Sequence, residues 1–228
     1  MKVLAFNGSP RMDKGNTALI LNPFLEGMRE AGAEVELFYT RKLNINQCTG
    51  ELLCWGKNPG KCHISDDMQF LYPKLCNTNI LVLSTPVYVP LPGRMQNLIN
   101  RLVPLMNPIL EIRDGRTRAR FRQGVNINKI VLVSSCGWWE KGNFDTVVRI
   151  FSELAEDVSV DFVGAVLRPH AEFLRKDNEQ TRGVLNAAKR AGYQLIKTGK
   201  ISLEILNIVS SELISLDRYM KINDQIHQ

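Results

Sequence analysis

The chain has 228 residues, and its 29 lysines and arginines against 23 aspartates and glutamates give a net charge of +6. A hydrophobic content of 44% and a charged content of 23% are typical of a globular protein and exclude a disordered or fibrous chain. The longest apolar run, residues 80–89, is too short for a bilayer and contains Ser84, Thr85 and Pro86. We therefore expect no membrane partner. The apolar N-terminus indicates a buried strand rather than a signal peptide, which predicts a cytoplasmic location.

Strand-like and helix-like segments alternate along the chain. Strands are predicted at residues 2–7, 33–39, 79–84, 129–135 and 158–167, and helices at 17–32, 66–77, 92–106, 144–156 and 179–198. Asp66 and Asp67 can cap the second helix, and Pro23 predicts a kink or a late start of the first. Short, nearly all-apolar strands joined by helices are typical of a parallel sheet that is buried on both faces. The pattern predicts an α/β fold: a flavodoxin-like, doubly wound, five-stranded parallel sheet with helices on both faces.

Residues 1–200 suffice for this sheet and form the predicted main domain, with an irregular, cysteine-containing insert at 43–65. Residues 201–228 form a predicted C-terminal helical extension. An apolar stripe follows the extension, and such a stripe packs on a core or on a sister subunit more often than on a membrane. Its members are Leu203, Ile205, Leu206, Val209, Leu213 and Leu216.

The segment at residues 7–17 lies between the first strand and the first helix, where an open α/β sheet presents its ligand crevice. Its hydroxyl, amide and guanidinium groups, together with the N–H groups of a helix start, suit a dianionic phosphate. The segment lacks the Gly-Lys-Ser/Thr of a Walker loop and the G-x-G-x-x-G of a dinucleotide turn. A nucleoside triphosphatase is therefore disfavoured, while a plain polar loop capped by Asn16 or Thr17 is the alternative.

Four ordered motifs carry a resemblance to a known family. They are GSPR followed by GNT at 8–17, PGKC-x-x-x-DDM at 59–68, TPVY at 85–88 and SSCGWWEKGNFD at 134–145. The chain is similar to the NADPH-dependent FMN reductase superfamily and resembles its iron-sulfur flavoprotein branch. The resemblance implies a flavodoxin-like domain that binds FMN and takes electrons from NADPH, NADH or another donor. It also implies an oligomer, a homodimer or homotetramer, in which the cysteine insert approaches a partner's flavin.

The resemblance also implies which residues bind FMN. Those for the phosphate are Ser9, Arg11, Asn16 and Thr17; those for the ring are Thr85, Pro86, Val87 and Tyr88; and those beside the pyrimidine edge are Ser135, Cys136 and Gly137. Backbone groups of a proline-containing turn and a flat tyrosine suit a flavin, since the protein then tunes the ring through hydrogen bonds. Tyr88 has an alternative interpretation as a half-buried loop aromatic, and Cys136 as a small buried residue.

Cys48, Cys54 and Cys62 occupy the place where the branch carries four cluster cysteines, and Glu51 stands at the second of those positions. Three arrangements remain open: a cluster held by three thiolates with Glu51 or a small ligand on the fourth iron, a three-iron cluster, or no cluster. Carboxylate is a hard ligand for cluster iron, and the spacing does not fit structural zinc, so ligand chemistry favours the loop without a cluster. His63 is expected at the surface or at a flavin edge, and Trp55 over a flavin or burying the loop.

Arginines at positions 113, 116, 118, 120 and 122 form a basic run, in which the last four alternate. In an extended segment these four share one face, which can meet the phosphates of NADPH, a nucleic acid or acidic neighbours. A salt-bridged hairpin is the structural alternative. Because no aromatic residues interleave with the run and no recognition motif accompanies it, we expect no nucleic-acid partner.

The leading hypothesis is an FMN-dependent oxidoreductase that passes electrons from a reduced nicotinamide to a small-molecule acceptor such as a quinone or free flavin. No catalytic acid or base stands out, since the histidines at 63, 170 and 227 are the only ones. The alternative is an electron carrier that shuttles electrons between protein partners such as a ferredoxin-like redox protein. A third hypothesis is a flavin-fold protein that has lost redox activity and acts as a binding subunit.

Overall fold

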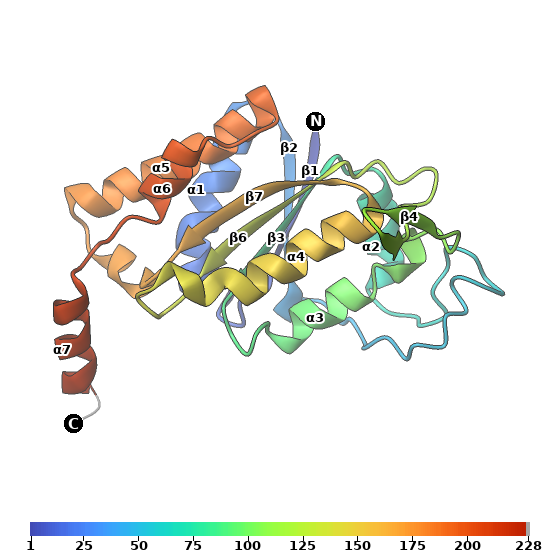
Figure 1. Cartoon of the computed structure of the whole chain (residues 1–228), viewed down its shortest axis with the longest axis horizontal. Helices are drawn as coiled ribbons and strands as arrows, with labels where there is room; N and C mark the ends of the chain where they lie inside the picture. The colour runs from blue at the N-terminus through green and yellow to red at the C-terminus, as the bar shows by residue number, and fades with distance from the viewer. Residues whose placement is uncertain (227–228) are drawn as a thin grey trace.

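The computed structural model describes residues 1–226, and its centre is a five-stranded sheet (Figure 1). In spatial order the strands are β2 (Glu34–Tyr39), β1 (Lys2–Asn7), β3 (Ile80–Pro86), β6 (Lys129–Ser135) and β7 (Asp161–Arg168). Every neighbouring pair is parallel. The order β2-β1-β3 reverses direction at β1, so the loops after β1 and β3 diverge and open a crevice at the carboxyl edge. The predicted flavodoxin-like sheet is confirmed.

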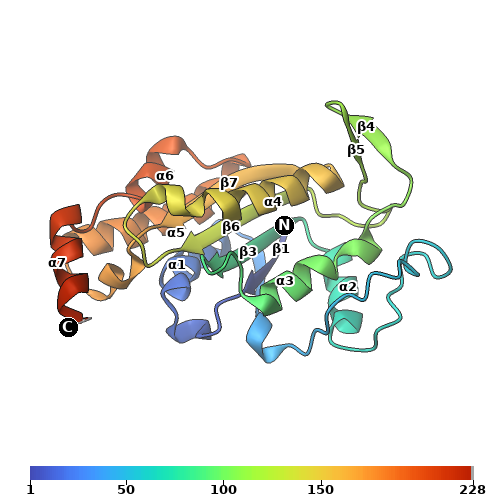
Figure 2. The same cartoon turned by 60° about the horizontal axis from the view of Figure 1, so that its bottom comes forward.

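Helices cover both faces of the sheet (Figures 1 and 2). On one face lie α1 (Asn16–Glu30), α5 (Glu179–Thr198) and α6 (Leu203–Val209), and on the other lie α2 (Met68–Cys76), α3 (Gly93–Asn100) and α4 (Asp145–Val158). The alternation of side chains along a strand divides the core accordingly. In β1, Leu4 and Phe6 pack under α2 and α3, whereas Val3 and Ala5 pack under α1 and α5.

Two glycines let α1 and α5 touch backbone to backbone. A Cβ atom on Gly192 would lie 1.9 Å from the Phe24 carbonyl oxygen, and one on Gly27 would lie 1.8 Å from the Lys189 carbonyl oxygen. The helix α1 begins at Asn16 and carries Pro23 in its interior, so the predicted late start is wrong. The first strand and the loop after it therefore feed directly into a helix that is locked against α5.

Several element boundaries differ from the predictions. The helix α3 ends at Asn100, and a separate short turn, η3 (Val103–Leu105), contains Pro104, whose ring would clash inside a longer helix. The helix α4 continues to Val158 and stops at Ser159, which adopts a left-handed conformation with φ of 61°. The strand β7 consequently begins at Asp161 rather than at residue 158.

A two-stranded hairpin projects from the body of the molecule before β6 (Figure 2). It joins β4 (Glu111–Arg113) to β5 (Arg116–Arg118) through Asp114 and Gly115, which have φ of 49° and 74°. Positive φ at both central residues of an Asp-Gly pair is the geometry of a tight hairpin turn. Part of the arginine run is thus extended, as expected.

The C-terminal segment leaves α5 and covers the edge of the sheet. Ile205 and Val209 of α6 are buried against α5 and β7, whereas Leu203 is exposed. The last helix, α7 (Leu216–Ile226), lies beyond the carboxyl edge (Figure 1). The extension proposed at 201–228 therefore begins by packing on the core, and its last two residues lie outside the described range. Among residues 1–226, no helix combines the length and the apolar character that a membrane crossing requires.

Candidate functional site

A cavity of about 160 Å³ opens at the carboxyl edge of the sheet, between the loops that follow β1, β3 and β6. Ten of the eleven residues that the sequence assigns to cofactor binding line it. They are Ser9, Arg11, Asn16, Thr17, Pro86, Val87, Tyr88, Ser135, Cys136 and Gly137. The eleventh, Thr85, is fully buried behind the cavity, and its hydroxyl donates to the Pro86 carbonyl over 3.0 Å. Its side chain is thus placed to shape the loop rather than to contact a ligand.

The loop after β1 is ordered by its own side chains. The Ser9 N–H donates to Asn7 Oδ1 over 2.8 Å, and the Arg11 N–H donates to Ser9 Oγ over 3.3 Å. The helix α1 then begins at Asn16 without a side-chain cap. The Ala18 N–H donates to the Gly15 carbonyl over 3.1 Å, and the N–H groups of Asn16 and Thr17, two residues that line the cavity, have no carbonyl partner inside the helix and are available to an anion.

Ser135 joins the three loops to one another. Its hydroxyl lies 2.7 Å from Thr17 Oγ1, and its carbonyl accepts the Val87 N–H over 2.8 Å. Both side chains of the first contact are buried. The spacing between the three walls of the cavity is therefore fixed by hydrogen bonds within the protein.

Two arginines that the sequence reasoning missed hold the loop after β1 from outside. Arg41 donates to the Pro10 carbonyl over 2.6 Å, and Arg175 donates to the Lys14 carbonyl over 2.7 Å and to Asn16 Oδ1 over 3.0 Å. Because their acceptors are neutral, these bonds do not offset the positive charge of either arginine. Together with Arg11 they make the cavity electropositive at the end formed by the loop after β1, where the sequence predicts a phosphate.

Exposed aromatic residues flank the other end of the cavity. Tyr88 is 65% exposed, and Trp138, which follows the lining residue Gly137, is 61% exposed. Cys136 is buried, its sulfur accepts the Trp138 N–H over 3.3 Å, and burial raises the pKa of its thiol. A protonated, enclosed thiol fits the interpretation of Cys136 as a small buried residue.

A buried Arg168–His170 pair supports the loop after β6 from behind. The Arg168 guanidinium donates to the Val209 and Ser211 carbonyls and to His170 Nε2, each over 2.8 Å. Nε2 also accepts the Leu213 N–H, so the imidazole proton is on Nδ1 and faces the Trp139 carbonyl. Burial, and then the Arg168 charge, lower the pKa of His170 to about 4. The pair fastens the C-terminal segment beneath the site.

The cysteine insert forms a second, smaller cavity, which we call the three-cysteine pocket. Cys48, Cys54 and Cys62 line it together, with Glu51 and His63 beside them, and its volume is about 20 Å³. His63 Nδ1 lies 2.6 Å from the Glu51 carboxylate, so His63 faces this pocket and not the cavity at the carboxyl edge. Burial, followed by the neighbouring Cys62, raises the pKa of Cys54. Trp55 donates to the Val103 carbonyl over 3.0 Å and so buries the loop.

Arg101 anchors the insert to the end of α3. It is 1% exposed and bonds the Asp66 carboxylate through both terminal nitrogens, at 2.6 and 3.0 Å. One of those nitrogens also donates to the Asn46 carbonyl. Asp66 in turn accepts the Met68 N–H at the start of α2 over 3.0 Å, whereas Asp67, the N-cap residue, makes no side-chain cap hydrogen bond, so only Asp66 serves the helix start as the sequence predicts. One buried ion pair thus ties both ends of the insert to the fold.

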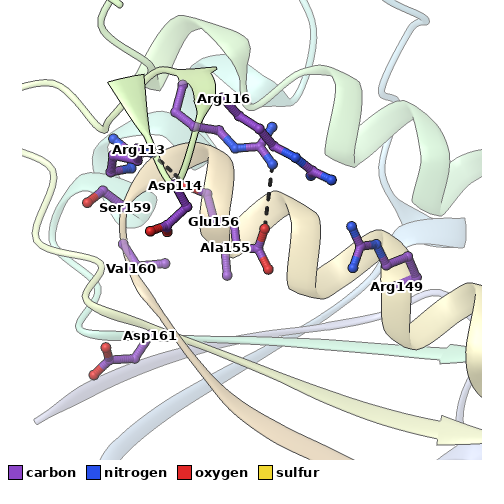
Figure 3. Close-up of a pocket in the computed structure, with 10 residues that line it drawn as sticks. Arg113, Asp114, Arg116, Arg149, Ala155, Glu156, Ser159, Val160 and Asp161 are labelled. Atoms are coloured by element: carbon purple, nitrogen blue, oxygen red, sulfur yellow. Dashed lines mark hydrogen bonds and ion pairs between the residues drawn. The ribbon is translucent and has the colours of Figure 1, made fainter. Parts of the chain in front are cut away.

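The basic run faces acidic neighbours. A cavity of about 530 Å³ separates the β4–β5 hairpin from α4, and Arg113, Arg116, Arg118 and Arg149 lie around it (Figure 3). Arg118 pairs with Glu153 and with Asp157, each over 2.8 Å, and Arg116 pairs with Glu153 over 3.1 Å. Arg113 and Arg120 pair with Glu111. The salt-bridged hairpin, which was the structural alternative for the run, is the arrangement observed.

Comparison with known proteins identifies the family. The family model described as NADPH-dependent FMN reductase matches residues 1–174. The chain belongs to the NADPH-dependent FMN reductase family. Its resemblance to the iron-sulfur flavoprotein branch also holds, because it is 34% identical over 106 residues to an iron-sulfur flavoprotein of Methanocaldococcus jannaschii, a match that covers 46% of this chain and 53% of that protein. An iron-sulfur flavoprotein of Archaeoglobus fulgidus is 33% identical over 102 residues, which are 44% of this chain and 48% of that protein.

The chain thus spans about half the length of the curated relatives that it matches. Solved structures of similar fold include an NAD(P)H:quinone oxidoreductase from Methanothermobacter marburgensis, with a TM-score of 0.61, 17% identity and coverage of 86% of this chain and 98% of that one. A putative quinone reductase from Klebsiella pneumoniae has a TM-score of 0.65 at 16% identity, with 86% and 85% covered. At these identities the likeness shows the fold of this FMN reductase family member.

Proposed function

We propose that this family member is an FMN-binding oxidoreductase that passes electrons from NADPH or NADH, through FMN, to a small-molecule acceptor such as a quinone or free flavin. The observation that carries the proposal is the cavity at the carboxyl edge of the sheet, where ten residues assigned from the sequence converge. FMN, when bound, supplies the redox chemistry, and the protein supplies binding, orientation and electrostatics.

The phosphate end of FMN fits the loop after β1. Serine, threonine and asparagine side chains, an uncapped helix start and the Arg11 guanidinium gather there. A Cβ on Gly15 would lie 2.5 Å from Ser9 Oγ, so only glycine lets the loop close this tightly around an anion. The neighbouring Arg41 and Arg175 add positive charge, and the partners that hold them here are neutral oxygens. A dianion is the ligand that this arrangement favours.

The ring of FMN fits the loops after β3 and β6. Both loops present backbone groups at the cavity, and the Val87–Ser135 bond keeps them at a fixed separation. Tyr88 can pack flat on the ring because most of its surface is free. The residues of the described chain act here by orienting the ring and by leaving one side open to a nicotinamide or to an acceptor.

A second function, electron transfer between FMN and a protein partner such as a ferredoxin-like redox protein, is favoured by one observation: the three-cysteine pocket. An electron carrier requires a donor or relay group, and thiolates in a compact loop can hold one. The two functions differ in what reduces the flavin. NADPH or NADH that bleaches bound FMN within catalytic times supports the oxidoreductase, and reduction by a ferredoxin-like donor alone supports the carrier.

The FMN site is tested by binding. Arg11→Ala removes a charge-assisted bond to the phosphate, which is worth about 1.5–3 kcal/mol, or roughly a 10- to 150-fold weaker Kd for FMN. Lys14→Ala is the matched control, because it removes the same charge from the same loop and Lys14 does not line the cavity. Fluorescence titration of the apoprotein with FMN measures both. Equal Kd values for Arg11→Ala and the unaltered protein would refute the phosphate assignment.

A further inference from the structure

We propose that Tyr219, on the last helix, is a positioning residue of the FMN site. Its hydroxyl holds the Gly137 carbonyl toward α7, so that the backbone at this part of the cavity offers FMN a hydrogen-bond donor and not an oxygen atom. The proposal rests on the proposed function, because it concerns the same cavity. It adds a residue that lies beyond residues 1–174, the part of the chain that the family model matches.

The C-terminal segment is hydrogen-bonded to the loop after β6, which forms one wall of the cavity. Trp139 Nε1 donates to the Ile214 carbonyl over 2.9 Å, and the Tyr219 hydroxyl donates to the Gly137 carbonyl over 3.1 Å. The Tyr219 ring also packs against the buried Phe173, with ring centroids 6.2 Å apart. Contacts with the body of the protein therefore set the position of the Tyr219 hydroxyl.

Hydrogen bonds fix the direction of the two peptide groups that meet at Gly137. The Cys136 carbonyl accepts the Ala171 N–H over 2.9 Å, so the Gly137 N–H, which is trans to that carbonyl, points away from Ala171. This N–H has no hydrogen-bond partner within residues 1–226, and Gly137 lines the cavity. In the next peptide group, Tyr219 holds the carbonyl, and the Trp138 N–H donates to Cys136 Sγ over 3.3 Å. Gly137 thus keeps a free donor while its carbonyl is occupied.

Gly137 itself indicates that a ligand approaches the backbone here. A Cβ atom on Gly137 would meet nothing within 4 Å beyond its chain neighbours, and its φ is not positive. Neither crowding nor backbone strain within the described protein therefore calls for glycine at this position. Close approach of the backbone to a ligand is a further physical reason for glycine, and it fits a residue of the cavity wall.

The Tyr219 hydroxyl matters because the other bond to its peptide group is weak. Sulfur is a weak acceptor and glycine is the most freely rotating residue, so without the hydroxyl the Gly137 carbonyl is free to turn toward the cavity. Burial, above all, raises the pKa of Tyr219, so the hydroxyl keeps the proton that it donates.

The direction of this peptide group affects the two redox states of FMN differently. Reduced FMN carries negative charge on the pyrimidine side of its ring, which the sequence places beside residues 135–137. An N–H donor stabilises that charge, because bonds to a charged acceptor are the stronger ones, whereas a carbonyl oxygen repels it. Tyr219 should therefore favour the reduced state of bound FMN over the oxidised state.

The test compares the midpoint potential of bound FMN in the unaltered chain and in Tyr219→Phe, which removes the hydroxyl and keeps the ring. An anaerobic, dye-coupled reductive titration measures the potential, and fluorescence titration measures the Kd of oxidised FMN. In Tyr219→Phe, reduced FMN should bind about tenfold more weakly relative to oxidised FMN, which lowers the two-electron midpoint potential by about 30 mV. Tyr193→Phe is the matched control, because Tyr193 is an exposed residue of α5 that does not line the cavity, and its potential should equal that of the unaltered chain.

A second variant tests the approach of FMN to the backbone. Gly137→Ala places a methyl group in space that is open in the protein alone, so the unfolding free energy of the apoprotein should not fall. The Kd for FMN should rise about tenfold or more, because the methyl group takes space that the ligand needs. Gly183→Ala, also in open space but on α5 and away from the cavity, should leave the Kd unchanged.

Two outcomes would overturn this proposal alone. An unchanged midpoint potential in Tyr219→Phe, even with a weaker Kd for oxidised FMN, would mean that Tyr219 has only a structural role. An unchanged Kd for FMN in Gly137→Ala would mean that the backbone at residue 137 does not meet the ligand. Failure of the unaltered chain to bind FMN would instead refute the proposed function, and this proposal with it.

Discussion

The buried ion pair between Arg101 and Asp66 allows a prediction of stability. Replacing Asp66 by Asn preserves the shape of the side chain but removes its charge and places an amide donor opposite the donors of Arg101. The Asp66 side chain is fully buried and accepts bonds from both terminal nitrogens of Arg101 and from the backbone of Asn46 and Met68. Breaking one side of such a pair leaves an uncompensated buried charge and costs about 3–5 kcal/mol.

Urea unfolding of the variant and the unaltered protein measures this loss. With a slope of about 3 kcal/mol per molar urea, the midpoint should fall by about 1 M or more. The exposed pair Arg182–Asp177, whose atoms also approach to 2.6 Å, gives the control. Asp177→Asn should cost less than about 1 kcal/mol, because solvent screens an exposed pair. If Asp66→Asn cost no more than Asp177→Asn, the reasoning about burial would be refuted.

The same pair has a pH signature. Burial is the largest single influence and raises the pKa of Asp66, but the hydrogen bonds from Arg101, Asn46 and Met68 and the Arg101 charge together outweigh it, so the pKa lies below its ordinary value of 3.8. A carboxyl whose pKa is lowered by folding stabilises the protein above the unfolded pKa, and this contribution is lost as the pH falls through the folded value. The difference in unfolding free energy between the unaltered protein and Asp66→Asn should therefore be constant above about pH 5 and shrink in more acidic solution.

Three further predictions follow from other contacts. Because the pKa of His170 falls from 6.5 to about 4 on folding, the unfolding free energy should decline by up to about 3 kcal/mol as the pH drops through that range. In His170→Gln, urea unfolding should show a smaller decline over the same pH range. Gly192→Ala should lower the melting temperature, since overpacking costs about 1–3 kcal/mol, whereas Gly183→Ala, in open space on α5, should leave it equal or higher. Arg118→Met should leave the KM for NADPH unchanged and lower the unfolding free energy by about 1 kcal/mol, because Arg118 pairs with acidic residues of α4. A raised KM would show instead that Arg118 binds the NADPH phosphate.

Much of the fold could be predicted because its signals are local. Central strands such as Ile80–Pro86 are buried on both faces, and most of each strand is an apolar run, here Ile80–Leu83. The ends of helices and strands were harder to predict. The end of α4 depends on the left-handed conformation of Ser159, and a serine in the sequence does not indicate that conformation. The helix α3 ended early for a similar reason, since a single turn around Pro104 separates from it.

The residues of the candidate site likewise include some that local motifs predict and others that only the fold brings together. Its lining comes from short segments at 9–17, 86–88 and 135–137, each of which carries a motif. Arg175 and Arg101 could not be found, because their roles arise from contacts across the fold: Arg175 lies 161 residues from Lys14, and Arg101 lies 35 from Asp66. No periodicity in one segment reports a partner so distant in sequence. The basic run was open to several interpretations until the acidic face of α4 was placed beside it.

The backbone contact between α1 and α5 has a consequence for ligand capture. Because Gly192 has no Cβ atom, the backbone of α5 approaches the Phe24 carbonyl of α1 directly. The two helices therefore cannot slide or rotate past one another without a clash. The first turn of α1 is thereby held in register before any ligand arrives. An anion that meets this turn loses its own freedom of motion but orders little of the protein. The loss of conformational entropy needed to order this turn occurs during folding and not on binding, so few contacts can give tight binding.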